Sequence, residues 1–169
     1  YLDLTGIRIA YYDPDFSNLM TDLTARGAVA TEINANALTL DSLRYYDVLM
    51  IADNVVSFSL GEIAVMRTWL EEGKSLWLMG DNDGSVLNLN RLLLGTGLQE
   101  RSLGNFVDGA FNNISTHFIT EGVNDLYATA YGTTLEVVAP AQGLVTDSLY
   151  NGFFSGIGRL GRGKVFVVC

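Results

Sequence analysis

Apolar and polar residues alternate in blocks along the first half of the chain, and these blocks predict strands and helices in turn. Residues 47–52 begin with Asp47 and continue as an unbroken apolar run, which is typical of a strand buried on both faces of a sheet. Residues 60–70 carry apolar side chains at helical spacing, and residues 75–79 form a second apolar run. Two strands joined by one helix lie parallel. The sequence therefore predicts a parallel βαβ unit over residues 47–83.

The helix of this unit has its own start and stop signals. Ser59 and Glu62 have the S-x-x-E spacing of a capping box, in which each side chain bonds the other residue's backbone N–H. Gly73 stands where a left-handed residue ends a helix.

Similar patterns predict the remaining elements. We expect strands at residues 6–12 and 28–33, the second at a sheet edge, and helices at residues 16–26, 40–44 and 86–94. Residues 104–131 are rich in Gly, Asn and aromatic residues without a clear period, so we expect an irregular loop or small-strand region there. Four late strands are expected at residues 134–138, 143–146, 150–156 and 164–168, the last after a tight turn at Gly161. The prediction is one three-layer α/β domain over residues 1–169, with a mainly parallel central sheet and late antiparallel strands.

Composition narrows the possible partners. Apolar residues make up 49% of the chain and charged residues 17%, which excludes a disordered chain. The net charge of −9 argues against nucleic acid and against an anionic membrane surface as partners. No apolar run is long enough to span a bilayer, no signal peptide is recognised and no cofactor is expected. The last strand runs to the end of the sequence, so we expect a piece of a larger protein whose other domains are its partners.

Several stretches together resemble the class I glutamine amidotransferase-like domains. They are the helix and strand at residues 60–81, the Leu-Asn-Arg-Leu-Leu segment from Leu89, the His-Phe-Ile-Thr-Glu-Gly-Val segment from His117, and Gly-Arg-Gly-Lys-Val-Phe-Val-Val from Gly161. The resemblance covers nearly the whole chain and implies a flavodoxin-like, amidotransferase-like sandwich. It points to the divergent set without amidotransferase activity. Such domains are accessory modules in secreted site-1-protease-like subtilases and in gliding-motility and intraflagellar-transport proteins.

The departures from working amidotransferases concern the catalytic residues. Working members carry a cysteine at the turn after the strand equivalent to residues 75–79, where the helix N-terminus lowers the thiol pKa. This turn reads Gly80-Asp81-Asn82, and the single cysteine is Cys169. His117 also stands unlike the catalytic histidine of active members. The resemblance therefore implies a non-catalytic module that serves domain packing, protein interaction or ligand binding in a larger secreted or cell-surface protein. Asn113 begins a glycosylation sequon, which matters only in a secreted protein.

Candidate ligand-binding residues follow the carboxyl ends of the predicted strands, where open α/β sheets bind ligands. They are Asp13, Asp15, Asp53, Asn54, Asp81, Asn82 and Asp83. Turn formation and helix capping account for such residues as well as ligand binding does. Carboxylates that converge here would suit Mg²⁺ or Ca²⁺. The alternative function is therefore a metal-dependent hydrolase or phosphatase, with Asp13, Asp15, Asp81 and Asp83 as candidate ligands.

His117 and the aromatic residues of the second half have two interpretations each. The lone histidine either ties a loop through backbone hydrogen bonds or takes part in a site. The aromatic residues either form core or leave an exposed patch for a neighbouring domain. They are Phe106, Phe111, Phe118, Tyr127, Tyr131, Phe153 and Phe154.

Overall fold

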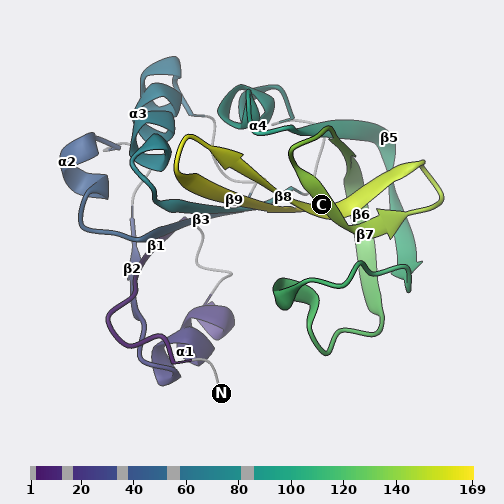
Figure 1. Ribbon diagram of the computed structural model, residues 1–169, viewed down its shortest axis with the longest axis horizontal. Coiled ribbons are helices and arrows are strands. Elements are labelled where there is room, and N and C mark those ends of the chain that lie inside the picture. Colours follow the sequence, from purple (N-terminus) through teal and green to yellow (C-terminus); the bar gives the residue numbers. More distant parts are fainter. Residues whose placement is uncertain (1–2, 13–16, 34–37, 53–57, 81–85) are drawn as a thin grey trace.

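The computed structural model describes residues 3–12, 17–33, 38–52, 58–80 and 86–169 (Figure 1). Its first half alternates strands and helices: β1 (Arg8–Tyr12), α1 (Ser17–Ala25), β2 (Val29–Glu32), α2 (Leu40–Leu43), β3 (Val48–Ala52), α3 (Leu60–Glu71), β4 (Ser75–Met79) and α4 (Val86–Leu93). Its second half consists of β5 (Leu98–Phe111), the 3₁₀ turn η4 (Phe118–Thr120), β6 (Leu126–Val137), β7 (Gln142–Asp147), β8 (Gly152–Leu160) and β9 (Gly163–Val168). Among the described helices, none is long and apolar enough to cross a membrane.

All the strands belong to one mixed sheet. Its order is β2-β1-β3-β4-β9-β8-β6-β5, and β7 pairs with β8 beside this path. The strands from β2 to β9 in this order are parallel, and the pairs that β8 forms with β9, β6 and β7 are antiparallel, as is the pair of β5 with β6. The predicted parallel core with late antiparallel strands is confirmed. The last strand in the chain, β9, lies beside β4 at the centre of the sheet.

The predicted boundaries of α3 are confirmed by the hydrogen bonds at its ends. The Ser59 hydroxyl accepts a hydrogen bond from the Glu62 N–H at 3.2 Å, and the Glu62 carboxylate accepts one from the Ser59 N–H at 2.8 Å. At the other end Gly73 has a φ of +108°, the left-handed conformation predicted for it. The sequence pattern alone therefore sets both ends of this helix.

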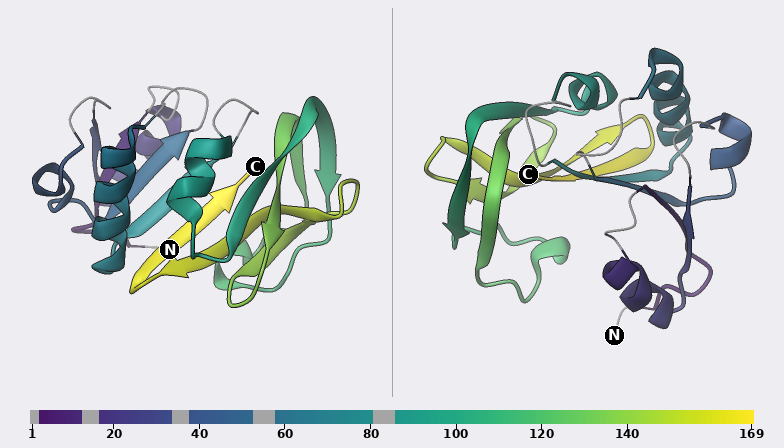
Figure 2. Two further views of the ribbon diagram at one scale, coloured as in Figure 1. Left: turned by 90° about the horizontal axis from the view of Figure 1, so that it is seen from above. Right: turned by 180° about the vertical axis from the view of Figure 1, so that it is seen from behind.

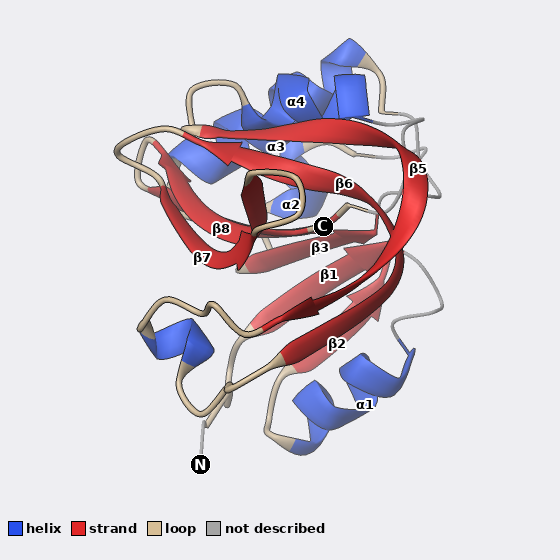
Figure 3. Cartoon of the chain, turned by 90° about the vertical axis from the view of Figure 1, so that its right-hand side faces the viewer, coloured by secondary structure: helices blue, strands red, loops and turns tan. Residues whose placement is uncertain are grey.

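Residues 104–131, predicted to be an irregular loop or small-strand region, are strand over half of their length and form longer strands than expected. The strand β5 continues to Phe111 and β6 begins at Leu126, and together they form a long antiparallel ribbon that curls away from the parallel strands (Figure 3). Register shifts between Ser102 and Val107 and between Val107 and Gly109 break the alternation of side chains. These irregularities hide the strand period in the sequence. Only the segment around η4, between the two strands, has the expected irregular form.

Helices lie on both faces of the sheet but cover them unequally. The helices α2, α3 and α4 lie on one face, where Trp69 of α3 is fully buried and its indole N–H donates to the Leu43 carbonyl at 2.8 Å (Figures 1 and 2). On the other face, Met20 of α1 packs with Ile9 and Met50. This second face carries α1 over β1, β2 and β3, and no described α-helix lies over β4, β9 and β8 (Figure 2).

Candidate functional site

The candidate residues at the strand ends cannot be placed. Asp13, Asp15, Asp53, Asn54, Asp81, Asn82 and Asp83 lie outside the described residues. Their role in ligand or metal binding stays a prediction. In the part of the chain that the structure describes, no three His, Cys, Asp or Glu side chains come close enough to hold a metal ion.

The described part of the carboxyl edge contains two buried polar side chains that the sequence analysis missed. Glu100 of β5 and Thr133 of β6 are each about 1% exposed or less, and both side chains lie against Gly80, which follows β4. A side chain at position 80 would collide with the Glu100 carboxylate. Asn90 of α4 holds the backbone of Glu100, donating to its carbonyl at 2.9 Å and accepting from its N–H at 2.8 Å. Glu100 was missed because the bulged ribbon that carries it shows no clear strand pattern.

A second polar group on the antiparallel side centres on the buried Asp147 carboxylate. It accepts hydrogen bonds from the Tyr131 hydroxyl at 3.3 Å and from the backbone N–H groups of Leu149 at 3.1 Å and Tyr150 at 3.3 Å. Burial of the phenol, reinforced by the negative charge of Asp147, raises the pKa of Tyr131 to about 12. Since these bonds tie a turn to a core ring, we interpret the group as structural.

The raised pKa of Tyr131 predicts a loss of stability at alkaline pH. In the unfolded chain a tyrosine loses its proton near pH 10, whereas folded Tyr131 keeps it to about 12. The unfolded state therefore binds fewer protons between these values, and the free energy of unfolding falls as the pH rises through this window. Tyr131→Phe should make this decline shallower. Urea unfolding of both proteins across pH 10 to 12 measures it, and equal slopes would contradict the placement of Tyr131.

The helix-free stretch of the second face forms a groove of about 710 Å³. Two rows of side chains cross β3, β4, β9 and β8 in register on this face. The first row is Val48, Ser75, Lys164 and Arg159, and the second is Met50, Trp77, Phe166 and Ile157. Apart from Met50, which packs in the cluster around Met20, these side chains line the groove. Directly paired residues of neighbouring strands point to the same side of a sheet, which places each row on one surface.

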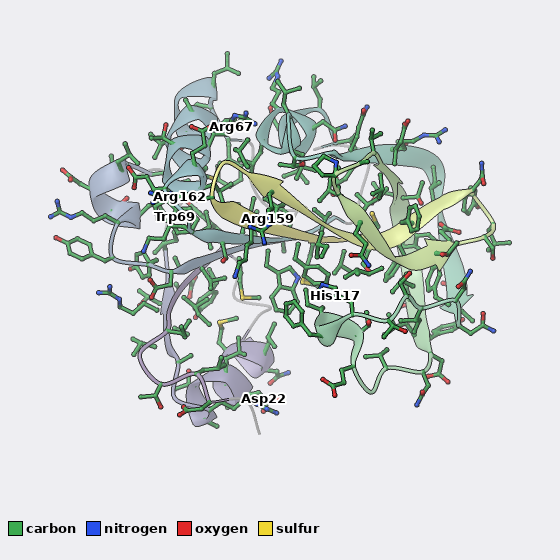
Figure 4. The ribbon with its side chains drawn as sticks, viewed as in Figure 1. Asp22, Arg67, Trp69, His117, Arg159 and Arg162 are labelled. Atoms are coloured by element: carbon green, nitrogen blue, oxygen red, sulfur yellow. The ribbon has the colours of Figure 1, made fainter. Side chains whose placement is uncertain are left out.

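The segment at η4 forms the wall of the groove opposite α1. His117, Phe118 and Ile119 line it, together with Pro140 and Gln142 (Figure 4). His117 caps η4. Its side-chain Nδ1 accepts a hydrogen bond from the Ile119 backbone N–H at 3.2 Å, and its backbone N–H donates to the Thr120 hydroxyl at 3.1 Å. These hydrogen bonds agree with the interpretation of His117 as a loop tie. The same residue also lines the groove, so its predicted role as a ligand-binding residue stays a prediction.

Aromatic side chains divide between the core and this groove. Phe111, Tyr131 and Phe154 pack against one another in the core, with ring centroids of Phe111 and Phe154 4.4 Å apart. Trp77 and Phe166 lie side by side on the groove floor at 5.5 Å. Phe118 is 78% exposed. Of the aromatic residues named from the sequence, Phe111, Tyr131 and Phe154 are therefore core and Phe118 is exposed, and a patch for a neighbouring domain stays a prediction.

The groove is positively charged within an acidic chain. Arg159 and Lys164 line it, and no aspartate or glutamate is among the lining residues that the structure describes. In the described part of the chain neither Arg159 nor Lys164 forms an ion pair, whereas the neighbouring Lys74 is held by Asp47 at 3.1 Å. The groove thus combines an apolar floor with two positive charges that form no ion pair among the described residues.

Comparisons with solved structures identify the fold. The chain is similar to the mmIFT52 N-terminal domain, with a TM-score of 0.74 and 16% identity over 95% of this chain and 84% of that one. A ThuA-like protein from Bacteroides uniformis has a TM-score of 0.70 and 10% identity over 99% and 83%. A glutamine amidotransferase from Thermotoga maritima has a TM-score of 0.63 and 12% identity over 96% and 74%. The chain therefore has an amidotransferase-like α/β fold.

No protein-family profile and no curated protein sequence matches the chain. At these identities the structural likeness defines the fold and leaves the activity open.

Proposed function

We propose that this chain is a non-catalytic, amidotransferase-like accessory module of a larger protein, and that it works by packing against a segment of another domain. The observation that carries the proposal is the groove on the helix-free stretch of the second face. A three-layer α/β domain buries both faces of its sheet. A segment bound in the groove would complete the layer that α1 begins.

The side chains of the groove support a binding role over a purely structural one. Trp77 and Phe166 are only partly buried, and Phe118 is 78% exposed. Isolated exposed leucines, such as Leu87 on α4, are ordinary in folded proteins. Contiguous apolar side chains around a depression mark an interaction surface instead.

The context of a larger, secreted or cell-surface protein is part of this proposal. One structural neighbour is an N-terminal domain. Asn113, the first residue of the glycosylation sequon, has an exposed side chain to which a glycan has access. The alternative of a metal-dependent hydrolase rests on aspartates outside the described residues, and no group of described residues favours it.

Binding of the anionic dye 8-anilinonaphthalene-1-sulfonate tests whether the groove is an accessible apolar site in the native protein. We expect saturable binding with a blue-shifted emission, because the dye combines aromatic rings with one negative charge. Phe118→Ser should weaken this binding several-fold, about 1 kcal/mol, since it removes an apolar wall. Leu87→Ser is the matched control: its leucine is 68% exposed outside the groove, and the change should leave binding unaltered. Absence of native-state binding, or equal weakening by both changes, would refute the proposal.

A further inference from the structure

We infer that the segment bound in the groove is an amphipathic α-helix that carries acidic residues beside its apolar face. The inference rests on the proposed function and adds the chemistry of the partner. Three features of the groove lead to it: a pair of like charges, the spacing of that pair, and the width of the helix-free face.

The like charges belong to Arg159 of β8 and Lys164 of β9. They are direct partners in the antiparallel pair of these strands, and both side chains are exposed. Like charges placed directly opposite each other destabilise a sheet. Carboxylates of a partner would neutralise both charges and relieve the repulsion.

The spacing of this pair matches acidic residues on one face of a helix. Directly opposed residues of an antiparallel pair have Cβ atoms about 4.5–5.5 Å apart. Residues three or four apart on a helix have Cβ atoms about 5–6 Å apart. Two acidic residues at i and i+4 therefore reach Arg159 and Lys164 together, while the apolar side chains of the same helix face Trp77 and Phe166 in the next row.

The helix-free face also has the width of one helix. Its three neighbouring strands, β4, β9 and β8, span about 10 Å between the outermost two, at about 4.8 Å per strand. A helix with its side chains is about 10–12 Å across. Since α1 already packs on the adjoining strands, a helix is the element that continues this layer (Figure 1).

The charge of the whole chain favours this site over others for an acidic helix. The chain carries a net charge of −9, so most of its surface repels an acidic segment. The described residues that line the groove include basic side chains and no carboxylate. An acidic helix is therefore attracted to the groove and not to the rest of the surface. Opposite charges across the interface then set the orientation of the helix.

Two stapled helical peptides of about five turns test the inference. Both peptides carry the same apolar face of leucine and alanine. Glutamates flank this face in the acidic peptide, and lysines flank it in the basic peptide. Fluorescence anisotropy measures the binding of each peptide to the protein. We expect the acidic peptide to bind at least about ten-fold more tightly than the basic one, with an advantage that shrinks as salt rises. The double change Arg159→Glu and Lys164→Glu should invert this preference. Arg91→Glu with Arg101→Glu alters two exposed arginines outside the groove and should preserve it.

The outcomes separate this inference from the function beneath it. Equal affinity of the two peptides, both weakened by Phe118→Ser, would overturn the acidic partner and leave apolar docking intact. Dye binding without binding of either peptide would indicate a small-molecule pocket and overturn the helix. If Arg91→Glu with Arg101→Glu also inverted the peptide preference, the attraction would be non-specific. If the protein formed dimers and the dye blocked them, a second copy of the chain would be the occupant. Either result overturns the inference. Binding of neither dye nor peptide would remove the proposed function as well.

Discussion

Trp69→Ala is expected to lower the free energy of unfolding by about 3–5 kcal/mol, a large part of the 5–15 kcal/mol that holds a typical domain together. The Trp69 side chain is fully buried between α3 and the sheet, so its removal leaves a cavity that neighbouring side chains fill only in part. The Leu43 carbonyl also loses its hydrogen bond from the indole N–H. Chemical denaturation measures the loss as a lower midpoint at constant slope.

Trp77→Ala is the matched control for this change. The same atoms are removed, but the Trp77 ring is partly exposed in the groove, so less apolar burial is lost. We expect the loss in free energy to be about half that of Trp69→Ala or less. Equal losses at the two positions would contradict the placement of Trp77 at an open face.

Gly163→Ala is expected to destabilise the chain by about 1–3 kcal/mol or more. Gly163 begins β9, directly after the tight turn from β8, and lies against the last turn of α3. An added Cβ would collide with the carbonyl group of Leu70, whose carbon would lie 2.8 Å away, and would approach the Lys74 carbonyl oxygen to 3.0 Å. These are backbone atoms, so relief requires the hairpin to move away from the helix.

Gly61→Ala is the control, and we expect it to change stability in the opposite direction. Gly61 lies in the first turn of α3, and an added Cβ there meets no atom closer than 3.8 Å. Alanine favours the helix over glycine, so Gly61→Ala should raise stability by up to about 1 kcal/mol. Thermal unfolding compares the two variants. A harmless Gly163→Ala would show that the β8–β9 hairpin does not pack closely on α3.

Elements with strong local signals were predictable from the sequence. The apolar runs at β3 and β4, the capping box at Ser59 and the left-handed Gly73 determine their structures through nearby residues alone. The end of β6 was predicted as a strand at residues 134–138, but the full length of the β5–β6 ribbon was missed because its bulges disturb the two-residue period of a strand. Its pairing is fixed by the partner strand rather than by its own sequence.

The groove could not be predicted because it depends on long-range register. Lys164 and Trp77 are far apart in sequence from Val48, and only the order β3-β4-β9-β8 brings their rows together. Nothing local in the sequence indicates that α1 stops short of these strands. Glu100 is a similar case, since the neighbourhood of Gly80 forms only when β5 folds back toward the carboxyl edge.

The two tryptophans allow the central claim, that the groove is the functional surface, to be tested by one measurement. Titration of ¹⁵N-labelled protein with the acidic peptide, followed by NMR, reports on both indole N–H groups at once. Both indole nitrogens are buried, but the Trp69 N–H is bonded to the Leu43 carbonyl, whereas the Trp77 N–H has no acceptor among the described residues and its ring lines the groove. We predict that the Trp77 indole signal shifts on binding while the Trp69 signal stays in place. A Trp77 signal that does not move, with shifts confined to Gly80 and Cys169 at the carboxyl edge, would contradict the account.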